Sequence, residues 1–219
     1  MEALTHCKLF EGIPLARILL IKSKIGAIEF GCGNGEVIIH QGESTEKLGV
    51  VLSGEIEAVH YRSDGTYTVI SVLGEGEVFA DFLAADDTAH SPATVSARGA
   101  CRVLLIPFAA LFSSLDGFEA EQRVILANLS KIYAEKYFEL KDRLVCVSAT
   151  TLRGKLTNYL YLMSERAGSD TFTIPFDRDG LAGYLNADRS ALSRELARMK
   201  KDGLIEYYKN SFKLRNGKK

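Results

Sequence analysis

The stretch that decides the fold of this chain is residues 176–205, which read FDRDGLAGYLNADRSALSRELARMKKDGLI. Its apolar residues recur at helical spacings, and residues that favour turns and helix caps interrupt them once, at 186–188. The pattern predicts two short helices joined by a tight turn. The second helix, roughly Arg189 to Lys201, directs Leu192, Leu196 and Met199 inward.

The second predicted helix has an exposed polar face whose residue types suit the major groove of DNA. Arginine can donate two hydrogen bonds to guanine, and serine can reach a base or a phosphate. The candidate DNA contacts are Arg189, Ser190, Ser193 and Arg194, and the candidate phosphate contacts are Lys200, Lys201 and Lys209. On periodicity alone, an ordinary pair of helices with a solvated charged face is the simpler explanation.

Two further features favour DNA binding over that simpler explanation. Two β-prone runs, at 204–208 and 212–215, flank Lys209-Asn210-Ser211, which indicates a hairpin of the kind that forms a wing beside a helix-turn-helix. From Ser148 to Lys219 the chain carries 14 Lys and Arg against 8 Asp and Glu, whereas the first 147 residues carry 13 against 20. A basic C-terminal module therefore follows an acidic one, and a basic module is what phosphate neutralisation requires.

Composition sets outer limits on the class of protein. At 219 residues and 47% apolar content, the chain is long enough for one large domain or two ordinary ones. No run approaches the roughly 18 apolar residues of a membrane helix, and the start of the chain lacks the features of a signal peptide, so a soluble cytoplasmic protein is expected. Cys7, Cys32, Cys101 and Cys146 are far apart, so no zinc or iron–sulfur ligand cluster is visible and each is expected to be a buried small residue.

The first half of the chain has the pattern of a β sandwich. A short helix is expected around 14–24, and short β-branched and apolar runs follow between Ile25 and Phe108. These runs lie at 37–39, 49–52, 56–61, 67–73, 93–97 and 101–106, with glycines between them and a hairpin turn at Asp64-Gly65. Many short strands at near-regular spacing predict a sandwich or a jelly roll.

A long helix is predicted between the two modules, at 118–147, with a length of about 45 Å. One apolar stripe alternates at spacings of three and four, with a break at Ser130, and consists of Leu126, Tyr133, Tyr137, Leu140, Leu144 and Val147. A second set, Ile125, Leu129 and Ile132, lies between them, so the helix needs partners on more than one side. The helix could pack only on its own β domain, but the heptad-like stripe favours a parallel contact with a second copy of the chain.

Three glycine-containing motifs in the β region occur in the order and spacing of a cyclic-nucleotide-binding jelly roll. They are Ile38-Ile39-His40-Gln41-Gly42-Glu43, Leu52-Ser53-Gly54-Glu55 and Gly74-Glu75-Gly76-Glu77-Val78-Phe79. Together with the motif Arg189-Ser190-Ala191-Leu192-Ser193-Arg194-Glu195-Leu196, the chain resembles a bacterial transcription regulator of the Crp/Fnr family. Each glycine motif is weak alone, but four motifs in one order, followed by a winged helix, are a strong signal, and the resemblance covers almost the whole length of the chain.

The resemblance implies an α+β fold with an N-terminal β jelly-roll sensor domain at 1–117, a dimerisation helix at 118–147 and a winged helix-turn-helix domain at 148–219. It implies a homodimer with its interface on the stripe of the long helix. It also implies sequence-specific binding to double-stranded promoter DNA, RNA polymerase as a further partner, and control by a small-molecule effector that the sequence does not identify.

The expected effector pocket departs from the relatives that bind cyclic AMP (cAMP). Those relatives carry a Gly-Glu pair followed by Arg-Ser, whereas the matching positions here are Ala80-Asp81 and Ser91-Pro92. A buried phosphodiester without a guanidinium partner is poorly compensated, and proline removes a backbone donor, so cAMP is disfavoured even though His90 or Arg98 could substitute. The candidate pocket residues are Phe79, Ala80, Asp81, Phe82, Ser91, Pro92, Tyr133 and Tyr137. The alternative is a cavity filled by its own side chains that binds no effector.

Other classes of function have less support. The four histidines are dispersed without an HxH pair, and no nucleophile elbow, Walker loop or zinc-protease helix occurs, so an enzyme or a metal-dependent cupin is not expected. A signalling module whose winged helix docks protein remains an alternative, as does a regulator that senses gas or redox state through haem bound by a His or Cys.

Overall fold

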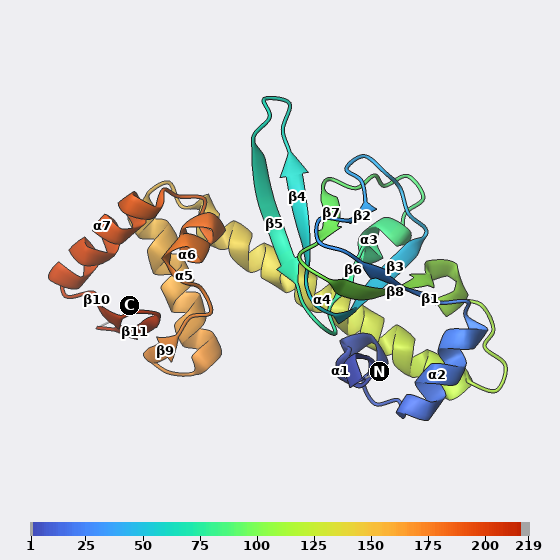
Figure 1. Ribbon diagram of the computed structural model, residues 1–219. Helices are drawn as coiled ribbons and strands as arrows, with labels where there is room; N and C mark the ends of the chain where they lie inside the picture. The colour runs from blue at the N-terminus through green and yellow to red at the C-terminus, as the bar shows by residue number, and fades with distance from the viewer. Residues whose placement is uncertain (1, 216–219) are drawn as a thin grey trace. The chain divides into compact units, whose positions relative to one another are not determined.

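The computed structural model describes residues 2–215 (Figure 1). The chain forms two compact units that divide within the long helix α4 (Glu119–Ser148), one ending at Tyr133 and the other beginning at Ala134. Each unit has its own hydrophobic core. Among the described residues, no helix combines the length and the apolar character needed to cross a membrane.

Short helices open the N-terminal unit. They are α1 (Glu2–His6), the 3₁₀ turn η1 (Lys8–Phe10) and α2 (Leu15–Lys24), of which only α2 was predicted. Pro14 lies just before α2, and Ile18 and Ile21 are buried, whereas Leu19 and Leu20 are exposed. A proline at this place costs no helical hydrogen bond, because the first backbone N–H groups of a helix have no partner within it.

Two four-stranded antiparallel sheets make the predicted jelly roll (Figure 1). One sheet has the order β1 (Ile28–Cys32), β8 (Cys101–Pro107), β3 (Lys47–Ser53), β6 (Val78–Phe79). The other has the order β2 (Val37–Ile39), β7 (Thr94–Ala97), β4 (Ile56–Tyr61), β5 (Tyr67–Leu73). Every strand pair is antiparallel, and residues from both sheets, among them Val51, Val95 and Val103, share one buried cluster. Strands β1 and β6 were not predicted.

One glycine of the sandwich is required by a close approach. Gly49 in β3 lies under the ring of Phe79, and a Cβ atom added to Gly49 would come within 2.0 Å of that ring. Phe79 is 4% exposed and pairs across the ladder with Gly49. The absence of a side chain at 49 therefore lets the aromatic ring fill the space between the sheets.

The first part of α4 completes the core of the N-terminal unit. Ile125, Leu129 and Ile132, predicted as a second apolar set, are all buried in it. The buried amide of Asn128 donates to the carbonyl oxygens of Leu9 and Glu11 at 3.3 and 2.8 Å. These contacts attach the helix to the N-terminal segment through both apolar packing and satisfied polar groups.

Helices and a small sheet make the C-terminal unit. After α4 come α5 (Leu152–Ala167), β9 (Thr171–Thr173), α6 (Arg178–Tyr184), α7 (Arg189–Lys201), β10 (Ile205–Tyr208) and β11 (Ser211–Leu214). The helix pair and the hairpin were predicted, and α7 has the predicted bounds. Helix α5 and strand β9 were not predicted; β9 pairs with β11, so the wing is a three-stranded sheet.

The last turns of α4 belong to the core of the C-terminal unit. Cys146 is buried there, in a cluster that includes Leu156 and Leu192. Arg143 donates to the carbonyl oxygens of Tyr184 and Gly183 at 3.2 and 3.3 Å, and so adds side-chain hydrogen bonds at the C-terminal end of α6.

Candidate nucleic-acid interface and effector site

Helix α7 is a well-terminated amphipathic helix. The carboxylate of Asp188 accepts a hydrogen bond from the backbone N–H of Ala191 at 2.8 Å and so caps its first turn. Leu192, Leu196 and Met199 are buried, as predicted. The buried stripe fixes which side of the helix faces outward, because residues three and four apart share one face.

The four predicted DNA-contact residues of α7 are all exposed: Arg189, Ser190, Ser193 and Arg194. They begin at the N-terminal end of the helix, which is the end that enters the major groove in helix-turn-helix proteins. The Ser190 hydroxyl donates to the Asp188 carboxylate at 2.5 Å and accepts from the Arg194 guanidinium at 3.1 Å. Asp188 and Ser190 thus orient Arg194, whose other N–H donors are available for a ligand.

Arg189 has a different environment from Arg194. Its guanidinium pairs with the carboxylate of Asp179 at 2.9 Å, and both side chains are more than 60% exposed. An ion pair with such exposure contributes little free energy, so a phosphate or a base can replace the carboxylate as the partner of Arg189.

Arg178 joins α6 to the wing and was not among the predicted site residues. Its guanidinium lies over the rings of Tyr207 and Phe212, at 5.1 and 5.5 Å from their centroids, and donates to the carbonyl of Lys209 at 2.9 Å. Lys209 adopts a positive φ of 51° in the two-residue turn of the wing. Because the contacts of Arg178 are with residues about 30 positions away, local sequence patterns could not reveal them.

An open hollow of about 370 Å³ lies beside the start of α7. It is lined by Asp177, Arg178, Asp179, Arg189, Lys209 and Asn210. Of these, only Arg189 and Lys209 were predicted as DNA contacts. The hollow thus brings an arginine of α7 and a lysine of the wing turn to one surface.

The predicted phosphate contacts are exposed lysines. The ammonium group of Lys200 lies 5.2 Å from the ring centroid of Tyr207, and that of Lys209 lies 5.7 Å from the ring centroid of Tyr208. Lys201 is also exposed. Rings beneath the first two lysines restrict the side chains while leaving their N–H donors open to water or phosphate.

Arg153 of α5 holds α7 in place. Its guanidinium contacts the carboxylates of Glu195 at 2.5 Å and Asp202 at 2.7 Å, and Glu195 also pairs with Arg198 at 3.3 Å. The Glu195 side chain is only 12% exposed. Hydrogen bonding from Arg153 lowers the pKa of Glu195 below its ordinary value, so the carboxylate stays charged and paired.

The predicted effector site is closely packed around α3 (Asp81–Ala84). Phe79 and Asp81 are buried, and Ala80 stands before the helix with a φ of 55°. The exposed ring of Phe82 stacks on Tyr133 with centroids 4.8 Å apart, and the Tyr133 hydroxyl donates to the Asp81 carbonyl oxygen at 3.2 Å. Burial, with a further contribution from Asp81, raises the pKa of Tyr133 to about 12, so the hydroxyl remains a donor.

Ser91 and Pro92 have no cationic group to offer a phosphodiester. The buried Ser91 hydroxyl donates to the carbonyl oxygen of Ala93 at 2.6 Å. Pro92 is exposed, and its carbonyl oxygen lies 2.6 Å from Nδ1 of His60. The Ser91 hydroxyl and the Pro92 carbonyl oxygen are therefore already paired with other groups of the jelly roll. Tyr137, the remaining predicted pocket residue, is 62% exposed in the C-terminal unit.

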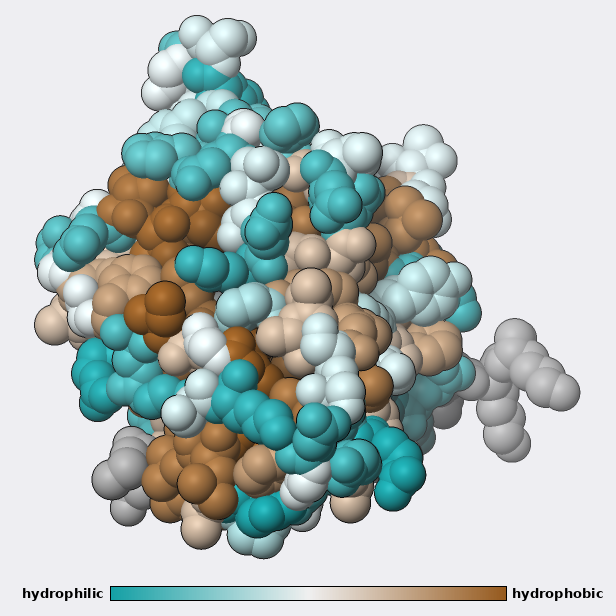
Figure 2. All heavy atoms as spheres, turned by 90° about the vertical axis from the view of Figure 1, so that its right-hand side faces the viewer, coloured by the Kyte–Doolittle hydropathy of each residue, from teal (hydrophilic) through white to brown (hydrophobic). Residues whose placement is uncertain are grey.

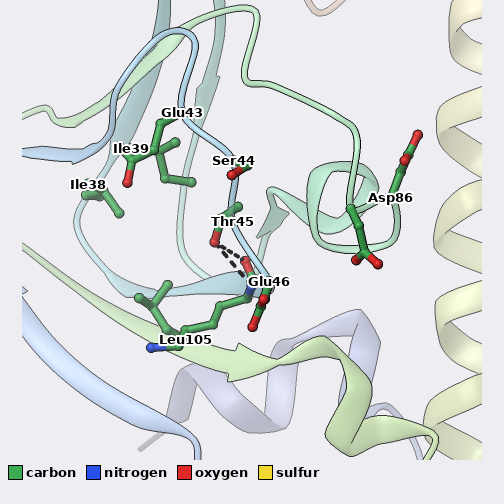
Figure 3. Close-up of a pocket in the computed structure, with 10 residues that line it drawn as sticks. Ile38, Ile39, Glu43, Ser44, Thr45, Glu46, Asp86 and Leu105 are labelled. Atoms are coloured by element: carbon green, nitrogen blue, oxygen red, sulfur yellow. Dashed lines mark hydrogen bonds between the residues drawn. The ribbon is translucent and has the colours of Figure 1, made fainter.

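A separate hollow of about 450 Å³ opens elsewhere in the jelly roll (Figure 3). It contains none of the predicted pocket residues and is lined by Ile38, Ile39, Glu43, Ser44, Thr45, Glu46, Lys47, Asp86, Asp87 and Leu105. Thr45 is hydrogen-bonded to the backbone of Lys47, as the dashed lines show. Four carboxylates against one lysine disfavour an anionic ligand such as a nucleotide phosphate in this hollow.

The surface of the N-terminal unit is mixed. Figure 2, which views the molecule from the side that carries α2 in Figure 1, shows hydrophobic groups in several separate patches with hydrophilic groups between them. The exposed apolar side chains of this unit include Leu20, Ile28 and Phe112. Scattered apolar residues of this kind are normal on soluble domains and do not by themselves mark a site.

The predicted dimer stripe of α4 divides into two parts. Leu126 and Tyr133 are partly buried against the core of the N-terminal unit. Tyr137, Leu140 and Leu144 are 62%, 67% and 64% exposed, and Val147 is partly buried. The second part of the helix therefore carries a row of large apolar side chains that a single chain leaves in contact with water.

The chain matches two known domain families in succession. The model of the cyclic nucleotide-binding domain matches residues 32–116, and the model of the Crp-like helix-turn-helix domain matches residues 154–219. A jelly roll followed by a winged helix-turn-helix defines the class of the protein as a DNA-binding transcription regulator. The two models together match most of the chain in this order, which is the domain composition of Crp/Fnr-type regulators.

The chain is also similar to individual proteins, over about half of its length in one case and over most of it in others. The chain is 34% identical over 108 residues to the voltage-gated delayed rectifier potassium channel KCNH5 of Mus musculus, a match that covers 48% of this chain but 10% of the channel. It is 19% identical to the CRP-like cAMP-activated global transcriptional regulator of Mycobacterium tuberculosis, over 90% of this chain and 87% of that protein. The structure of the c-di-GMP responsive global regulator CLP of Xanthomonas campestris has the same fold, with a TM-score of 0.57 and 14% identity over 92% of this chain and 99% of that one.

Proposed function

We propose that this protein binds duplex promoter DNA as a homodimer and reads its operator with the exposed face of α7. The observation that carries the proposal is the capped helix itself, which buries Leu192, Leu196 and Met199 and leaves Arg189, Ser190, Ser193 and Arg194 in solvent. Arg194 reads a base and is oriented by Ser190, while Lys200, Lys201 and Lys209 neutralise phosphates. The excess of basic residues after Ser148 supports the same role.

The homodimer forms through the second part of α4. Tyr137, Leu140 and Leu144 are the exposed residues of a heptad-like stripe, and a parallel contact with a second copy would remove them from water. Two-fold symmetry then presents two copies of α7 to half-sites about one turn of DNA, roughly 34 Å, apart. A regulator of this kind acts in the cytoplasm with RNA polymerase as a further partner, and it performs no reaction of its own.

The effector is a compound other than cAMP. The positions that would contact the phosphate of cAMP hold Ser91 and Pro92, and the serine hydroxyl already donates to the carbonyl oxygen of Ala93. Asp81, also at this site, adds a carboxylate that would repel a phosphodiester. The relatives named for cAMP and c-di-GMP respond to different nucleotides, which supports treating the sensor chemistry as specific to each protein.

The test compares Arg194→Ala with Lys201→Ala on an operator selected from random DNA. If Arg194 donates two hydrogen bonds to guanine, its loss costs about 1–3 kcal/mol per half-site and relaxes preference at one base pair, while binding to random DNA changes little. Lys201→Ala weakens specific and random binding equally and lowers the slope of log affinity against log salt by about one unit.

The opposite pattern would contradict this assignment of roles. Equal loss of specific and random affinity in Arg194→Ala would make Arg194 a phosphate contact and direct the search for base contacts to Arg189, Ser190 and Ser193. Absence of any salt-dependent DNA binding by the unaltered protein would overturn the proposed function as a whole.

A further inference from the structure

Two cysteines face each other at one end of the jelly roll. Cys32 is the last residue of β1, Cys101 is the first residue of β8, and the two are direct partners in the antiparallel ladder. Residues paired in this way have Cβ atoms about 4.5–5.5 Å apart on the same face of a sheet. A disulfide requires about 3.5–4.5 Å between Cβ atoms, so a small movement of the strand ends would bring the sulfur atoms to bonding distance.

The surroundings of the pair hold both side chains on the inner face of the sheet. Cys32 and Cys101 are 5% and 4% exposed and belong to the core shared by the two sheets. Gly54 lies against Cys101 so closely that a Cβ added there would come within 2.9 Å of the Cys101 Cβ. Cys101 is therefore confined on that side, and Cys32 remains its neighbour across the ladder.

The pair nevertheless lies close to solvent. The residues on either side of Cys32, Gly31 and Gly33, are exposed, and so are Ala100 and Arg102 on either side of Cys101. Strand β1 is an edge strand of its sheet. Local opening of an edge-strand end costs much less free energy than global unfolding, so a small oxidant can reach the thiols in the native protein.

The two thiols influence one another. The pKa of Cys32 is raised to about 11, most of all by burial, then by the charge and the hydrogen bond of the Cys101 thiol, and least by Glu36. Cys32 is therefore a thiol at neutral pH and is not an efficient nucleophile alone. A sulfenic acid formed slowly on either sulfur would meet the other thiol at once.

We infer that Cys32 and Cys101 are an oxidation site, at which a hydroperoxide or an equivalent two-electron oxidant forms a disulfide between β1 and β8. In the first step one thiolate attacks a peroxide oxygen, the O–O bond breaks, and sulfenic acid and water form once the released proton is taken up. In the second step the other sulfur attacks the sulfenic sulfur, the S–O bond breaks, and the oxygen leaves as a second water. Two thiols are oxidised, and one hydrogen peroxide is reduced to two waters.

The test treats the full-length protein with hydrogen peroxide, unfolds it in an alkylating reagent, and measures its mass with and without prior reduction. We expect two of the four thiols to escape alkylation, a loss of about 2 Da before alkylation that reduction reverses, and a proteolytic peptide that joins Cys32 to Cys101. The oxidised protein also unfolds at a higher temperature, because the bond constrains a loop of roughly 70 residues in the unfolded chain.

Matched variants assign the bond to the pair. A Cys7→Ala, Cys146→Ala variant keeps only Cys32 and Cys101, and after peroxide treatment both of its thiols must escape alkylation. A Cys32→Ala variant must form no disulfide within one chain. Mapping the unaltered protein gives the same information if a variant fails to fold. Four alkylated thiols after peroxide, uptake of oxygen without loss of the pair, or a bond between two chains would each overturn the inference.

Discussion

Arg153 is the residue whose removal gives the sharpest test of how α7 is held. In Arg153→Met the carboxylate of Glu195 loses its contact at 2.5 Å and keeps only Arg198 at 3.3 Å, while its side chain remains 12% exposed. Leaving a buried acceptor poorly paired costs about 1–3 kcal/mol. The ion pair between Arg153 and Asp202 contributes little free energy, because both side chains are more than 40% exposed.

We therefore expect Arg153→Met to lower the free energy of unfolding of the C-terminal unit by about 1–2 kcal/mol, a loss that calorimetry would record as a fall in Tm of roughly 5–10 °C. Arg153→Lys should recover only part of the loss, because one ammonium cannot reproduce two guanidinium contacts. The matched control is Arg215→Met, which removes a pair with Glu206 whose side chains are both about half exposed. Equal Tm values for the Arg153 and Arg215 variants would refute the reasoning.

The effect of Arg153 also depends on pH in a defined direction. The folded-state pKa of Glu195 is lowered, so the carboxylate contributes stability above its ordinary pKa of 4.5 and loses that contribution as pH falls below it. The Tm difference between the unaltered protein and Arg153→Met should therefore be constant near neutral pH and shrink below pH 4.5. A difference that grows as the pH falls would contradict this role for the ion pair.

Three further outcomes are expected. Replacing Leu140 and Leu144 by Lys should give a monomer in sedimentation, because the change puts like charges opposite one another in the dimer interface. The control variant Leu20→Lys, on the exposed side of α2, should remain dimeric. If both variants are dimers, the interface lies elsewhere. Gly49→Ala should destabilise the N-terminal unit by about 1–3 kcal/mol in urea unfolding, because the added Cβ collides with Phe79. Gly31→Ala should change the free energy of unfolding far less, because the nearest atom to a Cβ added there is 3.8 Å away. Millimolar cAMP should leave both Tm and operator affinity unchanged, and a rise of several degrees would show that Ser91 and Pro92 do not exclude it.

The parts of the fold that were predicted from the sequence have long apolar patterns or clear turn and cap residues at their ends. The bounds of α7 follow from the cap at Asp188 and the spacing of its leucines, and the β4–β5 hairpin follows from Asp64-Gly65 between two apolar runs. Strands β6 and β9 have two and three residues, too few for alternation to be visible, and they are defined only by pairing with β3 and β11. Helix α5 was not predicted, although it has a local signal in the Thr151 cap before Leu156, Tyr159 and Leu160.

The candidate sites also contain residues that could be predicted from local sequence patterns and residues that could not. The outward face of α7 could be predicted because helical periodicity alone determines which residues point away from Leu192 and Leu196. The roles of Arg153 and Arg178 could not, because their partners lie some 30 to 50 positions along the chain and are brought together only by tertiary packing. The effector site was located by motif positions, and no local pattern could have indicated that Ser91 and Tyr133 direct their hydroxyl groups to backbone carbonyls.

The contacts at the end of α4 determine where the chain can be divided. A fragment that begins at Thr151, after the long helix has ended, would lack Cys146 and Arg143, and so would leave a gap in the core and lose two hydrogen bonds at the end of α6. A fragment that begins near Ala134 would retain both. An isolated DNA-binding fragment of this regulator should therefore carry about half of the long helix, and shorter ones should be prone to unfolding and aggregation.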